Sequence, residues 1–148
     1  MKSFLAAFVA LVAFFTTPAL AREAEVYTGT FSSLAVGGYD TVAYFKVAKP
    51  TKGVAQFETE YKGATWRFAS KENLDAFKAN PTAYAPQYGG YCAWAVSQNY
   101  TASGDPNYWK IVNGKLYLNY DKSVQATWEK DIPGFIAKAD KNWPAVLN

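Results

Sequence analysis

The dipeptide Asn113-Gly114 is the strongest constraint on how this 148-residue chain folds. It separates two β-prone runs at residues 108–112 and 115–118. A two-residue turn between antiparallel strands needs positive φ at both central positions, which Asn-Gly adopts readily. The pattern therefore predicts a tight β-hairpin, and the rest of the chain must supply the core on which it packs.

The other local patterns predict a second hairpin, a further strand and several short helices. The hairpin is expected at residues 55–61 and 65–69, and the strand at residues 39–45, where aromatic and β-branched side chains gather. Capping residues, prolines and apolar spacing predict helices at residues 71–80, 92–97, 121–130 and 133–142. The predicted fold class is α+β: a small single domain of antiparallel hairpins packed against three to four short helices. We expect no internal repeat.

The first 21 residues have the features of a secretory signal peptide. Lys2 precedes an apolar core at residues 4–15, and an Ala-x-Ala site ends at Ala21. We expect cleavage after Ala21 and a periplasmic or secreted protein. The apolar core is shorter than the roughly 20 residues that span a bilayer, so no stable membrane anchor is expected. Residues 22–36 are predicted to be a leader, and residues 37–148 the folded domain.

The charge balance gives no reason to expect a nucleic-acid partner. The chain has 15 basic and 12 acidic residues, and removal of Lys2 with the signal peptide leaves 14 basic ones. Domains that bind nucleic acids usually carry a strongly basic patch. Charge therefore identifies no partner.

Side-chain chemistry is limited by the absence of histidine and by the presence of one cysteine, Cys92. Without histidine, Ser-His-Asp triads and His-containing zinc sites are excluded. Under oxidising conditions Cys92 is buried and inert, paired with the thiol of another molecule, or free for chemistry. If Cys92 lies in the first turn of a helix, the helix dipole lowers its pKa and favours redox chemistry or metal binding. The alternative is a buried, structural thiol beside Trp94.

Aromatic residues and glycines surround the cysteine. Tyr88, Gly89, Gly90, Tyr91 and Trp94 are candidate ligand-binding residues. Glycines permit close approach of a backbone to another group, and the rings form either part of the core or the wall of a ligand pocket. The sequence leaves these two alternatives open.

Several motifs between residues 37 and 143 resemble those of a known family. They are Gly38-Tyr39-Asp40-x-Val42-Ala43-Tyr44-Phe45, Tyr61-x-Gly63-x-x-Trp66-x-Phe68-Ala69-Ser70, Phe77-x-x-x-Pro81-x-x-Tyr84, Tyr88-Gly89-Gly90-Tyr91-Cys92-Ala93, Gly114-Lys115-Leu116-Tyr117-Leu118-Asn119 and Trp128-x-x-Asp131-Ile132. In these motifs the chain resembles exported bacterial proteins of the YHS-domain family, most closely the subgroup called YHS domain-containing (seleno)proteins. The resemblance implies the fold of that family.

The resemblance also implies a metal site whose ligands this chain lacks. Metal-binding members, found in heavy-metal transport and sensing proteins, carry cysteines at positions that correspond here to Ala43, Ala69 and Asn73. The histidine of the family's name is missing too, and none of the replacements binds a soft metal. The selenoprotein label implies a functional residue at Cys92, because it is the one position here that can correspond to selenocysteine.

These observations predict an exported accessory protein with a single functional thiol, for thiol redox chemistry or for handling a soft ion such as Cu(I). Metal binding through Cys92 would need an intermolecular ligand or oxygen donors as well. The alternative is a small-ligand or protein-binding module in which Cys92 only packs. An enzyme is the least expected class, and a thiol-dependent redox activity is the one that these residues would permit.

Overall fold

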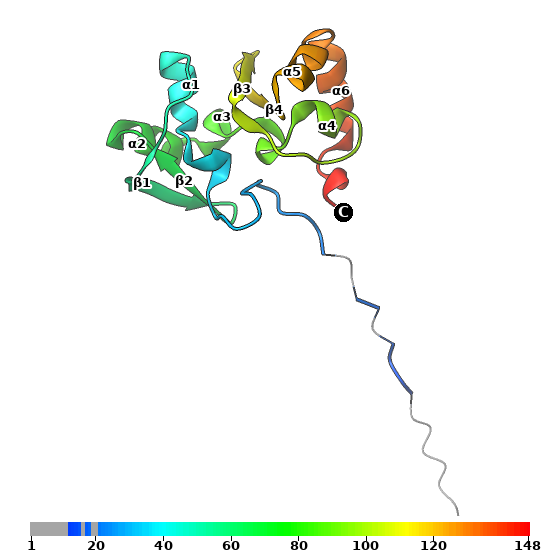
Figure 1. Cartoon of the computed structure of the whole chain (residues 1–148). Helices are drawn as coiled ribbons and strands as arrows, with labels where there is room; N and C mark the ends of the chain where they lie inside the picture. Colours follow the sequence, from blue (N-terminus) through cyan, green and yellow to red (C-terminus); the bar gives the residue numbers. More distant parts are fainter. Residues whose placement is uncertain (1–11, 16, 19–20) are drawn as a thin grey trace, which may run out of the picture.

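The computed structural model describes residues 12–15, 17–18 and 21–148, and it confirms the predicted α+β fold class (Figure 1). In chain order the elements are η1 (Ala35–Gly38), α1 (Thr41–Val47), β1 (Val54–Tyr61), β2 (Ala64–Phe68), α2 (Lys71–Ala79), α3 (Pro81–Tyr84), η2 (Gln87–Gly90), α4 (Ala93–Ser97), β3 (Asp105–Val112), β4 (Lys115–Asn119), α5 (Lys122–Glu129), α6 (Ile132–Asn142) and η3 (Ala145–Leu147), where η marks a 3₁₀ turn. Both predicted hairpins are confirmed, because β1 pairs with β2 and β3 pairs with β4, each antiparallel.

The strand predicted at residues 39–45 is wrong, because the chain forms helix α1 there. The side chain of Asp40 caps this helix: its Oδ1 accepts hydrogen bonds from Val42 N at 2.9 Å and from Ala43 N at 3.1 Å. Such a cap satisfies N–H groups that have no partner inside the helix, and it is typically worth about 1 kcal/mol. The cap and the burial of Val42 and Tyr44 together outweigh the β propensity of this stretch.

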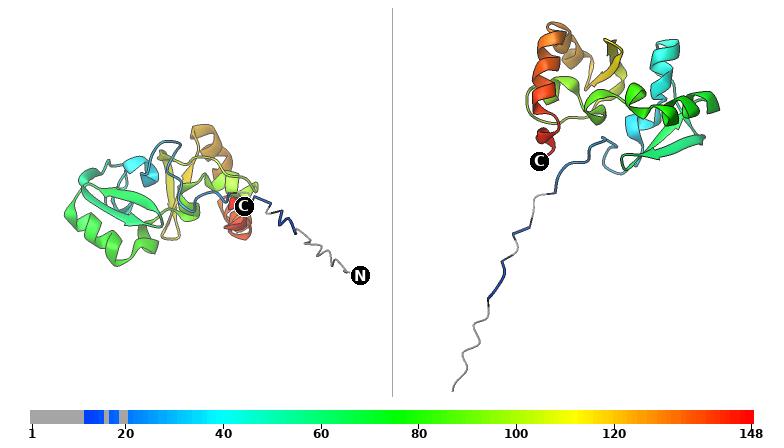
Figure 2. Two further views of the ribbon diagram at one scale, coloured as in Figure 1. Left: turned by 90° about the horizontal axis from the view of Figure 1, so that it is seen from below. Right: turned by 180° about the vertical axis from the view of Figure 1, so that it is seen from behind.

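The chain contains an internal structural repeat, which the sequence did not lead us to expect. Each half consists of a Gly-Gly-Tyr turn, a short helix, a β-hairpin and two further helices. The first half runs from η1 through α3, and the second half from η2 through α6. The two halves lie side by side (Figures 1 and 2).

The two hairpins have the same register at a constant offset of 51 residues. Pairing jumps across a bulge from Val54↔Phe68 to Glu58↔Arg67 in the first, and from Asp105↔Asn119 to Trp109↔Leu118 in the second (105 − 54 = 51; 118 − 67 = 51). Ser70 and Asp121, at the same offset, cap α2 and α5. Phe77 and Trp128 are the buried side chains of these two helices. The repeat therefore extends from the backbone to the capping and core positions.

Strand β4 connects the cores of the two halves. Leu116 and Leu118 belong to a hydrophobic cluster that contains Trp66 of the first half. Tyr117, between them, belongs to a second cluster that contains Trp128. Successive side chains of a strand point to opposite faces, so one short strand contributes to both cores.

The segment predicted to be a leader, residues 22–36, contacts both halves. Val26 is buried, Tyr27 N donates to Gly89 O at 3.0 Å, and Thr65 N donates to Ser33 O at 2.8 Å. This segment therefore forms part of the packed structure.

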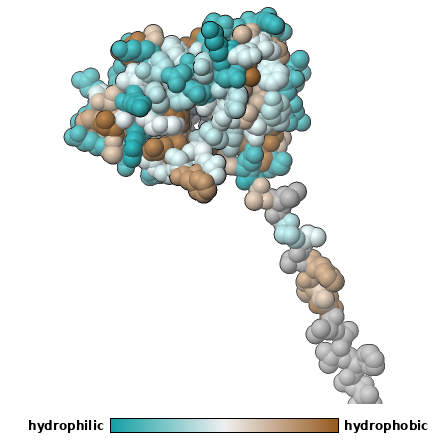
Figure 3. All heavy atoms as spheres, in the orientation of Figure 1, coloured by the Kyte–Doolittle hydropathy of each residue, from teal (hydrophilic) through white to brown (hydrophobic). Residues whose placement is uncertain are grey.

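Most of the predicted signal peptide, residues 1–11, 16 and 19–20, lies outside the described residues. Among those that are described, no helix has the length and the hydropathy needed to cross a bilayer. The face of the molecule in Figure 3 carries hydrophobic side chains only in small separate areas. This face therefore offers no large apolar docking surface, and the cavities and buried polar groups are the candidate sites.

Candidate functional site

In the first half, the positions that the resemblance assigns to metal ligands surround a buried carboxylate, Asp40. Oδ1 accepts from the N–H groups of Val42 and Ala43, and Oδ2 accepts from Ala69 N at 2.8 Å and from Asn73 Nδ2 at 2.7 Å. Asp40 is completely buried. Four donors therefore bind its two oxygens, and the carboxylate already has the partners that burial demands.

In the second half, Cys92 takes the place of Asp40. Each residue follows a Gly-Gly-Tyr turn and precedes a short helix, and each main-chain N–H bonds a carbonyl at 2.8 Å, Thr51 O for Asp40 and Ala102 O for Cys92. Only 1% of Cys92 is exposed, and its Sγ donates to Oδ1 of Asn119 at 3.5 Å. The same backbone arrangement therefore holds a carboxylate in one half and a thiol in the other.

The thiol is protonated at neutral pH. Burial raises the pKa of Cys92 above its ordinary value of 9.0, and the N–H groups of Ala95, Tyr120 and Trp94 act in the opposite direction without cancelling this effect. The predicted lowering of this pKa is therefore wrong. Helix α4 has only five residues, and its dipole is outweighed by the desolvation of the charged form.

Cys92 borders a small cavity, here called the thiol pocket. Its volume is about 220 Å³, and it is lined by Cys92, Trp94, Ala95, Tyr100, Ala102, Tyr120 and Val124. Tyr100 and Tyr120 are 47% and 52% exposed, so the pocket reaches the surface at these side chains. Cys92 therefore lies at the edge of a pocket that opens at the surface, although almost none of the residue is exposed.

The thiol pocket lies where the second half repeats the ligand positions implied by the resemblance. Ala95, Tyr120 and Val124 follow Ala43, Ala69 and Asn73 by 52, 51 and 51 residues (95 − 43; 120 − 69; 124 − 73). Asn73 reaches Asp40 with its amide, whereas Val124 has no polar atom with which to reach Cys92. The thiol therefore has no side-chain donor equivalent to Asn73 at this position.

Asn119 is buried beside the thiol and incompletely bonded. Its Oδ1 accepts from Trp94 N at 3.1 Å and from the thiol of Cys92, but its Nδ2 has no hydrogen-bond partner. Only 1% of Asn119 is exposed. Asn119 ends one of the family-like motifs, but no sequence pattern predicts its contact with Cys92, because the two residues are 27 positions apart and meet only through the fold.

The five residues predicted to bind a ligand do not line one common cavity. Trp94 lines the thiol pocket, whereas Tyr88 and Gly89 line another cavity, and Tyr91 packs against Tyr27 with its hydroxyl donating to a main-chain carbonyl. Gly90 is buried. The stretch around Cys92 therefore contributes to separate sites and to the core.

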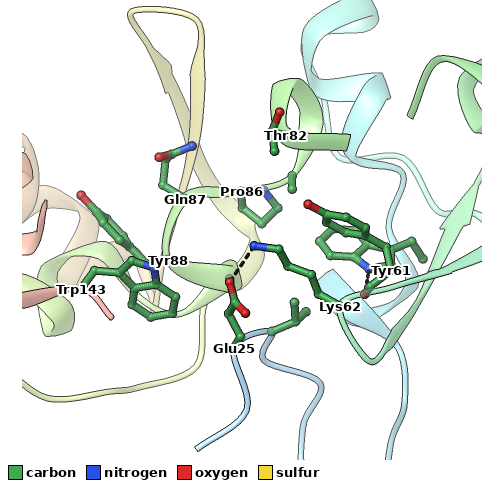
Figure 4. Close-up of a pocket in the computed structure, with 12 residues that line it drawn as sticks. Glu25, Tyr61, Lys62, Thr82, Pro86, Gln87, Tyr88 and Trp143 are labelled. Carbon is green, nitrogen blue, oxygen red and sulfur yellow. Dashed lines mark hydrogen bonds and ion pairs between the residues drawn. The ribbon is translucent and has the colours of Figure 1, made fainter. Parts of the chain in front are cut away.

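The cavity that contains Tyr88 lies between the two halves (Figure 4). Its volume is about 250 Å³, and it is lined by Glu25, Val26, Tyr61, Lys62, Trp66, Thr82, Ala85, Pro86, Gln87, Tyr88, Gly89 and Trp143. Tyr88 and Trp143 lie together on one side and Tyr61 on the other, while Lys62 Nζ reaches Glu25 Oε1 at 2.6 Å. Sequence patterns missed Glu25, Lys62 and Trp143, because these side chains come from segments that meet only in the fold.

A resident metal ion does not fit the residues that the structure describes. In that part of the chain, no group of three His, Cys, Asp or Glu side chains is placed to hold a metal ion. The lone pairs of Asp40 are used by four hydrogen bonds, and Cys92 has an amide oxygen rather than a second soft ligand beside it.

Comparison with known proteins identifies one domain. A YHS domain is found at residues 42–88, which run from α1 into η2. No curated protein and no solved structure matches the chain. Most of the matched residues belong to the first half, and the match ends before Cys92. The residues that line the thiol pocket therefore lie in the second half, which repeats the same plan beyond the match.

Proposed function

We propose that this chain is an exported protein, of the YHS domain-containing (seleno)protein subgroup, that acts through Cys92 on small molecules entering the thiol pocket. The observation that carries this proposal is the position of Cys92 at a cavity that reaches the surface. The signal-peptide pattern at residues 1–21 supports export to the periplasm or the medium.

Thiol redox chemistry suits this site better than metal handling. Cu(I) requires further soft ligands, whereas the side-chain atom that forms a hydrogen bond with Sγ is a hard oxygen, Oδ1 of Asn119. A copper-type ion at Cys92 would take its other ligands from a second molecule. Reaction with a small disulfide or a peroxide needs only the sulfur itself.

The surroundings of Cys92 restrict the reagents on which it acts. The thiolate is the reactive form, and burial keeps most of the thiol protonated at neutral pH. The pocket holds about 220 Å³ and is lined mainly by aromatic and aliphatic side chains. We therefore expect slow reaction, with small uncharged reagents preferred over large or anionic ones.

The test is labelling of the folded protein with methyl methanethiosulfonate, which is small and uncharged, and with the bulky anionic disulfide 5,5′-dithiobis(2-nitrobenzoate). We expect the first reagent to label Cys92 and the second to fail until the protein is unfolded. Cys92→Ser gives the background, and Val124→Phe, which fills the pocket, should slow labelling. If neither reagent labels the folded protein, or if labelling tracks global unfolding in urea, the proposal is wrong.

A second candidate function is a small-ligand-binding module in which Cys92 only packs. The cavity between the halves supports it, because Tyr61, Tyr88 and Trp143 form facing aromatic walls beside the Lys62–Glu25 ion pair. Such walls suit a planar aromatic ligand.

Indole is a suitable probe for this second function. Its binding should shift backbone amide resonances of the lining residues in two-dimensional NMR spectra, and Trp143→Ala should abolish the shifts. Cys92→Ser should bind indole as the unmodified protein does. Shifts spread over the whole surface, or shifts that persist in Trp143→Ala, would exclude this cavity as the site.

A further inference from the structure

We infer that Cys92 is a site of oxidation by hydrogen peroxide, and that its sulfinate takes the hydrogen bonds that the Asp40 carboxylate has in the first half. The inference rests on the proposed function, because the peroxide needs the thiol pocket as its route to the sulfur. Beyond the proposed function, the inference specifies the product, a sulfinate at Cys92, and gives a reason for its stability.

A cysteine sulfinate resembles an aspartate in shape and charge. In both, two oxygens are attached to the atom that follows Cβ, and the group carries one negative charge at neutral pH. Asp40 and Cys92 hold equivalent places after the Gly-Gly-Tyr turns. Oxidation of Cys92 therefore produces in the second half the group that the first half already contains.

Three backbone N–H groups are available to this anion. The donors are Val42, Ala43 and Ala69 around Asp40, and Trp94, Ala95 and Tyr120 around Cys92. A thiol sulfur is a weak acceptor, so Ala95 N and Tyr120 N have only a weak partner while Cys92 is reduced, and Trp94 N donates to Oδ1 of Asn119 at 3.1 Å. Charged oxygens accept much stronger hydrogen bonds from the same groups.

The side chain of Asn119 is an independent indication that this site can hold an anion. Its Nδ2 is buried without a partner, although its Oδ1 lies 3.5 Å from Sγ. A buried donor without a partner destabilises a protein, because the donor has lost its bonds to water and gained none in return. A sulfinate has no proton to donate to Oδ1, so a half-turn of the amide would present Nδ2 to a sulfinate oxygen. The half-turn also breaks the bond from Trp94 N to Oδ1, and Trp94 N then donates to the sulfinate instead. Asn73 Nδ2 makes this type of bond to Asp40 at 2.7 Å.

The chemistry proceeds in two oxidations of the sulfur. Sulfur attacks one peroxide oxygen, the O–O bond breaks, and Cys–SH and H₂O₂ give Cys–SOH and H₂O. A second H₂O₂ gives Cys–SO₂H and H₂O, and the acid then releases its proton to solvent. The chain has no other cysteine to trap the sulfenic acid as an internal disulfide. The second oxidation therefore faces no intramolecular competition.

The first test treats the folded protein with hydrogen peroxide and analyses the Cys92 peptide by mass spectrometry. We expect a gain of two oxygen atoms, and a higher Tm for the oxidised protein than for the reduced protein. The only methionine is Met1, and Cys92→Ser controls for oxidation elsewhere. A product that stops at one oxygen, or an oxidised protein with a lower Tm, overturns the inference.

The second test examines the hydrogen bonds without oxidation. Cys92→Asp supplies the anion and Cys92→Asn is its neutral control of similar size, so Cys92→Asp should have the higher Tm. Asn119→Leu should reduce that difference. The opposite order, or a Cys92→Asp protein that fails to fold where Cys92→Asn folds, overturns the inference.

The two proposals fail in different ways. If methyl methanethiosulfonate does not label the folded protein, the proposed function fails, and the oxidation inference fails with it. If labelling succeeds but no stable sulfinate forms, only the oxidation inference fails.

Discussion

Asp40 and Cys92 each lie at a junction between a Gly-Gly-Tyr turn and a short helix. The two junctions have the same backbone arrangement but differ in how many of their buried polar groups have hydrogen-bond partners. Around Asp40, four donors meet two carboxylate oxygens. Around Cys92, one thiol faces three N–H groups and an amide whose Nδ2 has no partner, beside a cavity. The polar groups of the first junction therefore have their partners, whereas the second junction has a cavity beside the thiol and a donor without a partner.

The largest expected effect is that of removing the carboxylate. Asp40→Ala should lower the free energy of unfolding by about 4 kcal/mol, because several buried N–H groups lose their acceptor at once. Cys92→Ala should lower it by only about 1 kcal/mol, because it removes a small group with one weak hydrogen bond. Urea titrations of both variants measure the difference. Equal losses would show that the two junctions contribute alike to stability.

The next effect concerns two positions that match in register but differ in surroundings. Leu118 is buried where β4 contributes to the first core, whereas Arg67, 51 residues earlier, forms a partly exposed ion pair with Glu58 at 3.0 Å. Leu118→Ala should therefore destabilise the protein by about 3 kcal/mol, and Arg67→Ala by about 0.5 kcal/mol. Both variants should unfold in one transition by circular dichroism and by tryptophan fluorescence. Two separate transitions would mean that the halves are independent, contrary to a shared β4.

The hairpins and most helices could be predicted, because their signals are local. Asn113-Gly114 and Lys62-Gly63 determine turns, and Ser70 and Asp121 mark helix starts. Helix α1 was not predicted, because the same residues carry two local signals. Asp40 favours the start of a helix, whereas the β-branched and aromatic residues that follow it favour a strand.

The repeat and the surroundings of the thiol could not be predicted in this way. The halves share turns, caps and core positions, but equivalent residues differ, as Phe77 and Trp128 do. The burial of Cys92 depends on Asn119 and Tyr120, which the fold brings from the end of β4. Tertiary contacts of this kind leave no periodic pattern near the cysteine.

A smaller effect is expected when the hydrogen-bonding side chains of the first junction are introduced into the second. Cys92→Asp and Val124→Asn together supply the carboxylate and an amide at the position equivalent to Asn73. We expect a favourable coupling energy of about 1 kcal/mol between them in a double-mutant cycle, because the amide can donate to the carboxylate. Val124→Leu, which has no donor, should show no coupling with Cys92→Asp. If the asparagine and leucine cycles agree, the two junctions differ in more than these side chains.

The smallest expected effect is a dependence of stability on alkaline pH. Burial raises the folded-state pKa of Cys92 above 9.0, so above that pH the unfolded chain loses its thiol proton before the folded protein does. The folded state then binds more protons, and its stability relative to Cys92→Ser should fall as pH rises above 9.0, by less than about 1 kcal/mol per pH unit. Buried tyrosines such as Tyr117, whose pKa burial also raises, are common to both proteins and cancel in the difference. Urea titrations at several pH values measure it. A difference that rises with pH instead would show that the N–H groups stabilise the thiolate, and that this junction holds an anion even before oxidation.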